Sequence, residues 1–149
     1  MRSADFYKSR AWFYFSRYVL LYHSIESNGV FNVRCATSGR YMDITSKMCH
    51  CGHWLKVFGA SSQTTFATAF DFRNCLPQHH AQNIYMGGNE IEMARSINRI
   101  HGEGTTEELY SKSKEYCKLD KYELERIKNE YKTKFDELVK IKGKNPWKK

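Results

Sequence analysis

The feature that most constrains the fold is a change of hydrophobic periodicity along the chain. Residues 5–23 carry apolar and aromatic side chains at spacings of three and four, which predicts an amphipathic helix. These side chains are Phe6, Trp12, Phe15, Val19 and Tyr22. Residues 31–72 lose that spacing and alternate β-branched and aromatic residues with glycines, which favours short strands and hairpins. The "SNGV" of residues 27–30 separates the two regions and is typical of a turn that ends the helix.

Helical spacing returns twice in the second half of the chain. In residues 86–104 we expect a helix with Asn89 as its N-cap and Gly102 as its end. Its apolar positions are Ile91, Ala94, Ile97 and Ile100. Residues 120–142 predict a long amphipathic helix that either packs on the domain or pairs as a short coiled coil. Its apolar positions are Leu124, Ile127, Tyr131, Leu138 and Ile141. A basic tail follows, with Trp147 as a candidate stacking residue.

The chain length fits one domain with appendages. A chain of 149 residues can bury a core without disulfides or metals. The alternating regions predict an α+β fold in three segments: an N-terminal aromatic helix in residues 1–30, a core in residues 31–104 and a helical extension in residues 105–149. The most apolar stretch, "AWFYFSRYVLLY", is too short to span a bilayer and contains Arg17. We therefore expect a cytoplasmic protein with no membrane partner.

The charge balance indicates the class of partner. The chain has 24 Lys and Arg against 16 Asp and Glu, a formal charge of +8. Such a surplus favours a polyanionic partner such as nucleic acid, the alternative being that it serves solubility alone.

Cysteine and histidine gather in the middle of the chain. Four of the five cysteines (35, 49, 51 and 75) fall in the same region as His50, His53, His79 and His80. This clustering favours reduced thiols and metal or catalytic chemistry over a disulfide framework. A cysteine nucleophile would need a thiolate activated by a histidine, and Cys49, Cys51 or Cys75 with His53 would satisfy that requirement. The spacing does not select one of them.

A structural zinc site would need four ligands, usually as two close pairs. Cys35 is followed three residues later by Ser38, and His79 by Gln82, so each pair lacks a good second ligand. Cys49, Cys51 or Cys75 would have to complete the site.

The same motifs resemble a known family. "CATSG", "CGHW" and "NCLPQHHAQN" occur in the order and context of the phage lambda NinG/Rap recombination endonucleases, within the HNH or ββα-metal nucleases. The similarity covers roughly residues 10–115. It implies a small ββα-metal core flanked by the N-terminal amphipathic helix and the long C-terminal helix.

The family pattern is a C-x-x-C-G knuckle, then G-H-aromatic, then N-x-H-P-Q-C-x-x-C-N. The matching residues are Cys35, Gly39, Gly52, His53, Trp54, Asn74, Pro77, Gln78 and Asn83. The departures are Ser38, Leu76, His79 and Gln82. The catalytic positions are therefore kept better than the zinc positions.

The resemblance implies a role for each matched position. His53 would be the general base that activates water, and Asn74 would orient it through a hydrogen bond. Asn83 would hold a catalytic Mg²⁺ or Mn²⁺, with His50 favoured as the second ligand over Asp43 further upstream. We expect the structural zinc to be lost; its candidate ligands are Cys35, His79, Cys49, Cys51 and Cys75.

These roles imply a metal-dependent endonuclease that cuts branched DNA, such as Holliday junctions or D-loops. Basic residues around the cluster and on the following helix would contact phosphates of branched or duplex DNA. They are Arg34, Arg40, Lys47, Lys56, Arg73, Arg95 and Arg99. The two-fold symmetry of a junction favours a homodimer, with the C-terminal helix as its contact, in the cytoplasm of a bacterial host if a phage encodes the protein. The alternative is a non-catalytic DNA-binding or scaffold protein on an eroded HNH fold.

Overall fold

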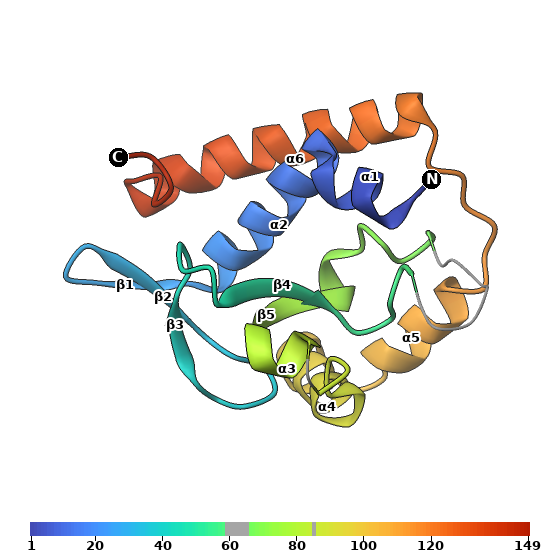
Figure 1. The fold of residues 1–149 in the computed structure, drawn as a ribbon, viewed down its shortest axis with the longest axis horizontal. Coiled ribbons are helices and arrows are strands. Elements are labelled where there is room, and N and C mark those ends of the chain that lie inside the picture. Colours follow the sequence, from blue (N-terminus) through green and yellow to red (C-terminus); the bar gives the residue numbers. More distant parts are fainter. Residues whose placement is uncertain (59–65, 85) are drawn as a thin grey trace.

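Two small antiparallel sheets lie among helices in the computed structural model, which describes residues 1–58, 66–84 and 86–149 (Figure 1). The strands are β1 (Ile25–Ser27), β2 (Val30–Arg34), β3 (Tyr41–Asp43), β4 (Cys49–His53) and β5 (Cys75–His79). The helices are α1 (Ser3–Lys8), α2 (Arg10–His23), α3 (His80–Ile84), α4 (Glu90–His101), α5 (Thr105–Lys112) and α6 (Lys121–Lys142), with a 3₁₀ turn, η1 (Phe72–Asn74). The α+β class is confirmed. Among the helices of the described residues, none is both long and apolar enough to cross a bilayer.

The N-terminal aromatic region forms two helices where the sequence predicted one. Ser9 has extended backbone angles and separates them: its hydroxyl donates to the Phe6 carbonyl at 2.7 Å and accepts from the Trp12 N–H at 3.2 Å. This N-cap begins α2 on a new axis. The predicted apolar face is wrong at Tyr22, which is 51% exposed, whereas Phe6, Phe15 and Val19 are fully buried.

The "SNGV" turn has a different role from the predicted one. α2 ends at His23, and Asn28 and Gly29 form the tip of the β1–β2 hairpin, in which Ser27 pairs with Val30. Both tip residues have positive φ, 52° and 79°, as a tight two-residue hairpin turn requires. β3 then pairs with β2 to complete the three-stranded sheet.

The second sheet is a hairpin of β4 and β5, and α3 begins directly after β5. In its register Cys49 pairs with His79 and His53 pairs with Cys75. One face of the hairpin packs on α2, where Cys75 joins the core around Phe15. The other face packs on α4 and α5, where Leu76 meets an apolar cluster. The hairpin is thus buried between two layers of helices.

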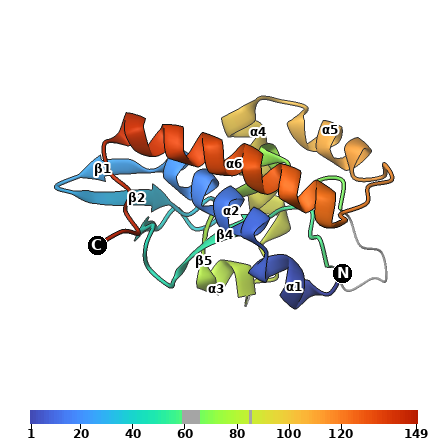
Figure 2. The same ribbon diagram turned by 90° about the horizontal axis from the view of Figure 1, so that it is seen from above.

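The long C-terminal helix packs within the chain. α6 lies along α2 (Figure 2), and the rings of Phe15 and Tyr131 meet edge to face with centroids 4.8 Å apart. The α6 residues Ile127, Tyr131 and Phe135 are buried, while Ile141 is 80% exposed. The face that the sequence offered for a dimer contact is therefore occupied by α2.

The predicted apolar face of α4 is also corrected. Ile91 and Ile100 are 70% and 44% exposed, and the buried residues are Met93, Ser96 and Ile97. Gly102 ends the helix as predicted. Asn89 precedes it but does not cap it, because its side chain donates to Gln82 at 2.9 Å.

The close packing at Gly52 yields a first prediction. A Cβ at Gly52 would overlap the side-chain oxygen of Gln78, which is completely buried. We expect Gly52→Ala to lower the free energy of unfolding by about 1–3 kcal/mol, the usual cost of overpacking, as measured by urea denaturation. The double variant Gly52→Ala/Gln78→Ala should lose less free energy of unfolding than the two single variants lose in sum. Strictly additive losses would show that the Gln78 side chain is not the obstacle.

Candidate functional site

Three polar side chains meet where β4 and α3 lie side by side. The Asn83 amide nitrogen donates to Nδ1 of His50 at 3.1 Å. A neutral His50 then carries its proton on Nε2, which lies 3.3 Å from Nδ1 of His80. Burial and then the neighbouring His80 lower the pKa of His50, so the neutral form is favoured at pH 7. The structure thus brings together the two residues predicted to bind metal, His50 and Asn83, and adds His80.

Asp43, the alternative ligand, does not join this group. Its carboxylate accepts from the backbone N–H and the hydroxyl of Thr45, both at 2.8 Å, and so stabilises the turn after β3. His50 and Asn83 instead line a cavity of about 350 Å³ along α2. His53 is not among the residues that line it.

His53 lies buried among aromatic rings. His53 is only 7% exposed. Its ring stacks on Trp12 with centroids 5.0 Å apart, and the centroid of the Phe6 ring lies 6.2 Å away. Its Nε2 lies 2.8 Å from the Ala69 carbonyl, so Nε2–H donates and Nδ1 is unprotonated. Burial lowers the pKa of His53 to about 4, against the opposing effect of the Ala69 bond. The imidazole is therefore neutral at pH 7.

Strand alternation separates His53 from His50. Residues three apart in a strand point to opposite faces, so the two predicted site histidines of β4 do not converge. The geometry thus places the predicted base and the predicted metal ligand on different faces of β4.

Asn74 holds the backbone around His53. Its side-chain oxygen accepts from the Leu55 N–H at 2.8 Å, and its side-chain nitrogen donates to the carbonyls of Leu55 at 3.0 Å and Thr68 at 3.1 Å. Thr68 precedes Ala69, whose carbonyl accepts from His53. Asn74 therefore makes no direct bond to the His53 side chain, and its contacts are with the backbone next to His53 and next to Ala69.

Hydrogen bonds occupy the positions that correspond to the zinc knuckle. The Cys35 sulfur accepts from the backbone N–H of Ser38 at 3.4 Å and of His79 at 3.2 Å. Burial alone would raise the pKa of Cys35, but hydrogen bonds from Ser38, His79 and Thr37 lower it to about 7. The Nδ1 of His79 accepts from the Ala81 N–H at 3.1 Å. In the described ranges, no three His, Cys, Asp or Glu side chains are grouped so as to hold a metal ion.

Cys49 and Cys75 of the hairpin are protonated thiols. Burial, followed by the neighbouring Cys51 and Cys35, raises the pKa of Cys49 to about 12. Burial and a hydrogen bond with Cys51 raise the pKa of Cys75 far above its ordinary value. A raised pKa disfavours the thiolate that a nucleophile requires. The interpretation as a nucleophile activated by His53 is therefore not supported for Cys49 or Cys75.

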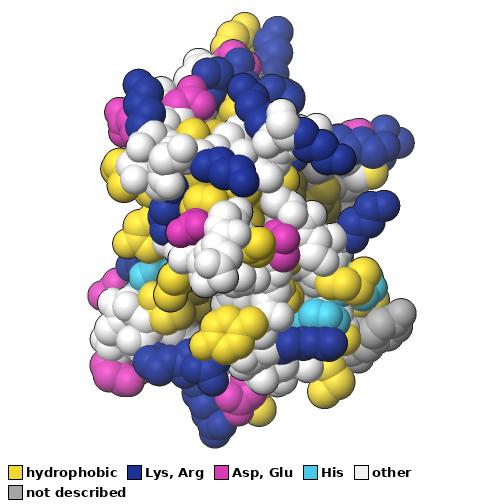
Figure 3. All heavy atoms as spheres, turned by 90° about the vertical axis from the view of Figure 1, so that its left-hand side faces the viewer, with side chains coloured by type: hydrophobic (Ala, Val, Ile, Leu, Met, Phe, Trp, Pro, Cys, Tyr) yellow, Lys and Arg dark blue, Asp and Glu magenta, His cyan; other side chains and the backbone are white. Residues whose placement is uncertain are grey.

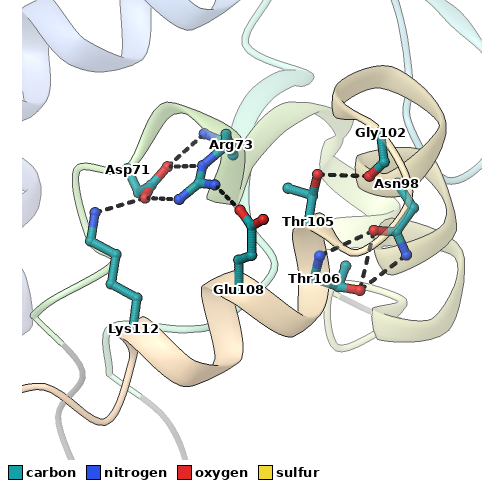
Figure 4. Close-up of polar contacts among 8 residues, drawn as sticks. All are labelled: Asp71, Arg73, Asn98, Gly102, Thr105, Thr106, Glu108 and Lys112. Carbon is teal, nitrogen blue, oxygen red and sulfur yellow. Dashed lines mark hydrogen bonds and ion pairs between the residues drawn. The ribbon is translucent and has the colours of Figure 1, made fainter.

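The predicted DNA-binding residues differ in whether ion pairs within the protein engage them. Arg73 is engaged within the protein: its guanidinium pairs with Asp71 at 3.0 Å and with Glu108 at 2.8 Å (Figure 4). Lys112 also pairs with Asp71 at 2.8 Å. Burial would raise the pKa of Asp71, but these cations lower it to about 2. The network fastens η1 to α5, so a DNA contact by Arg73 would have to compete with it.

The other basic residues are more accessible. Arg34 and Arg99 line a second, polar cavity of about 220 Å³, and Arg95 pairs with Glu92 on the surface of α4. Arg40 and Lys47 are exposed, and Lys56 is half-buried. From the side of β1–β3, Lys and Arg side chains dominate the upper part of the surface, with acidic side chains among them (Figure 3).

Sequence reasoning gave no site role to Arg17, which lines the larger cavity, or to His80, which contacts His50 beside it. Trp147, the candidate stacking residue of the tail, also lines the cavity. The adjacent histidines 79 and 80 were visible in the sequence, but only the strand register places the second one next to His50. Nothing local to the tail signals that Trp147 folds back toward α2.

The burial of His53 yields a prediction for stability against pH. Its pKa is about 4 in the folded protein and 6.5 in its ordinary state, so the unfolded chain binds the proton first as pH falls. Stability is therefore lost as pH decreases from 6.5 to 4, by up to about 1.4 kcal/mol per pH unit for each such histidine. His23, whose pKa burial also lowers to about 4, adds to the slope. Urea denaturation at several pH values measures it.

The control for this prediction is His53→Gln. Glutamine has no titration in this range and keeps an N–H that can donate to the Ala69 carbonyl. Between pH 6.5 and 4, the free energy of unfolding of the variant should change less steeply with pH, by the contribution of about one proton. An unchanged slope would show that His53 is accessible to protons in the folded protein.

Comparison with known protein families, curated proteins and solved structures finds no match for this chain.

Proposed function

We propose that the protein is a metal-dependent DNA endonuclease that acts on branched recombination intermediates such as Holliday junctions or D-loops. The observation that carries this proposal is the meeting of His50, His80 and Asn83 on an antiparallel hairpin followed by a helix. That order of elements and the motifs in it resemble the ββα-metal nucleases. The +8 charge suits a nucleic acid partner.

The donor set of the site indicates which cations fit. An imidazole and a side-chain amide suit a first-row transition ion, and they suit Mg²⁺ poorly because that ion prefers carboxylates and water. Of the two cations expected from the resemblance, Mn²⁺ is therefore favoured. A divalent cation held by His50 and Asn83, the pair that meets at Nδ1 of the imidazole, would supply charge stabilisation for the phosphate and the leaving oxygen.

The chain's own residues supply the proton chemistry. His53 is the proposed base: the Ala69 carbonyl fixes its tautomer and leaves Nδ1 free to accept a proton from water. Asn74 holds the backbone that positions both groups. Trp12 and Phe6 pack against the ring, and His53 lies outside the cavity that His50 and Asn83 line, which is the feature of the site that fits the nuclease proposal least.

This packing is also the observation that favours the second candidate, a non-catalytic DNA-binding or scaffold protein. A histidine with Trp12 stacked on it is a good core residue, and the cation site lacks a carboxylate. A homodimer remains part of the nuclease proposal because a junction is cut in pairs. Its contact would have to use a surface other than the buried face of α6.

The nuclease proposal predicts cleavage of a synthetic four-way junction in Mn²⁺, with duplex and single strand assayed in parallel. His53→Gln should reduce the cleavage rate by about 10²- to 10⁴-fold, because it removes the base while keeping the donor to Ala69. Junction binding should be unchanged. Tight binding with no cleavage by the unmodified protein would favour the scaffold candidate, and full activity of the variant would remove His53 from the mechanism.

The donor set predicts the order of metals. Cleavage at a fixed cation concentration should be faster in Mn²⁺ than in Mg²⁺. His50→Ala and Asn83→Ala should each raise the Mn²⁺ concentration needed for half-maximal rate by about 10- to 100-fold. Asp43→Asn is the matched control and should leave it unchanged. If all three variants needed the same Mn²⁺ concentration for half-maximal rate, the cation would bind elsewhere.

A further inference from the structure

The larger cavity is a groove along α2. Residues from Trp12 to Leu20 line one side, a stretch of roughly 12 Å at 1.5 Å per helical residue. His50, Asn83 and Trp147 of the C-terminal tail also line it. Its volume of about 350 Å³ is within the range of sites that hold a small ligand or a segment of one.

The lining combines aromatic rings with one cation. Tyr7, Trp12 and Trp147 all border the groove. The Arg17 guanidinium lies 4.9 Å from the centre of the Trp147 ring and 4.0 Å from that of Phe13, so cation–π contacts hold it in place. Among the described residues, no carboxylate lies within ion-pair distance of Arg17, and no Asp or Glu lines the groove.

We propose that this groove binds an unpaired DNA strand, with a base stacked on Trp147 and a phosphate facing Arg17. Aromatic rings beside a cationic groove without acids are the features by which proteins hold single strands irrespective of sequence. The faces of a paired base are covered by its neighbours in the duplex stack. Trp147 can therefore stack only on a base of an unpaired strand. The inference deepens the proposed function, because it places the strand that leaves a branch point beside His50 and Asn83.

The test measures binding in EDTA, where cleavage is suppressed. Fluorescence anisotropy compares a blunt duplex, the same duplex with a single-stranded overhang, and the same overhang made of abasic sites. The overhang should bind roughly tenfold more tightly than the blunt duplex, and the abasic overhang should lose most of that gain. Equal affinity for the natural and abasic overhangs would overturn the inference, because stacking requires a base.

Variants assign the effect to the groove. Trp147→Ala should abolish the overhang preference, whereas Trp147→Phe, which keeps a ring packed near Phe135, should retain most of it. Tyr116→Ala removes an aromatic that is 91% exposed outside the groove and should change nothing. If Trp147→Ala lowers the thermal stability, Trp147→Phe against Tyr116→Ala still decides whether a ring at this position is sufficient. If both Trp147 variants kept the preference for the overhang, the unpaired strand would bind elsewhere on the protein.

The two proposals fail separately. An overhang preference that depends on Trp147, without cleavage in any metal, would leave the groove inference standing and refute the nuclease. Cleavage of junctions without any overhang preference would support the nuclease proposal and refute the groove inference.

Discussion

The structure depends on the burial of α2 on two sides. Phe15 packs on Tyr131 of α6 and shares the same core with Cys75 of the hairpin, so one helix joins the C-terminal extension to the small sheet. A two-stranded hairpin by itself is marginally stable in water. β4 and β5 persist because α2 covers one face and the cluster around Leu76 covers the other. The three sequence segments are therefore one cooperative unit in which the N- and C-terminal helices hold the central strands.

The same burial decides the chemistry available at the hairpin. Burial keeps His53 neutral and keeps the protons on the thiols of Cys49 and Cys75. His50 lies at the groove with Asn83, where polar neighbours and space are present. A histidine that stabilises the core and a histidine that faces a ligand site thus lie three positions apart on one strand. The division follows from the pleat of the strand.

Hydrogen bonds to Cys35 join the loop after β2 to the hairpin. Cys35 accepts two backbone N–H groups, from Ser38 of its own turn and from His79 at the end of β5. These bonds tie the loop after β2 to the hairpin, as a shared ion would. Gln78 adds a second tie by donating to Thr37 at 3.1 Å. The expected loss of structural zinc stays a prediction, and these contacts, with a core large enough to fold without metal, are compatible with it.

Local patterns were sufficient for the α+β class, the turn at Asn28 and Gly29, the end of α4 at Gly102 and the long helix after residue 120. Each depends on periodicity or on the backbone preference of a single residue, which the sequence by itself determines. Tertiary structure decided the rest: that Ser9 breaks the first helix, that Ile91 faces solvent, and that α6 packs inward. It also decided which side chains form the candidate site. His80 meets His50, and Trp12 covers His53, only because strand register and helix docking join residues far apart in the chain. Such non-local contacts depend on the whole packed core, and no short stretch of sequence encodes them.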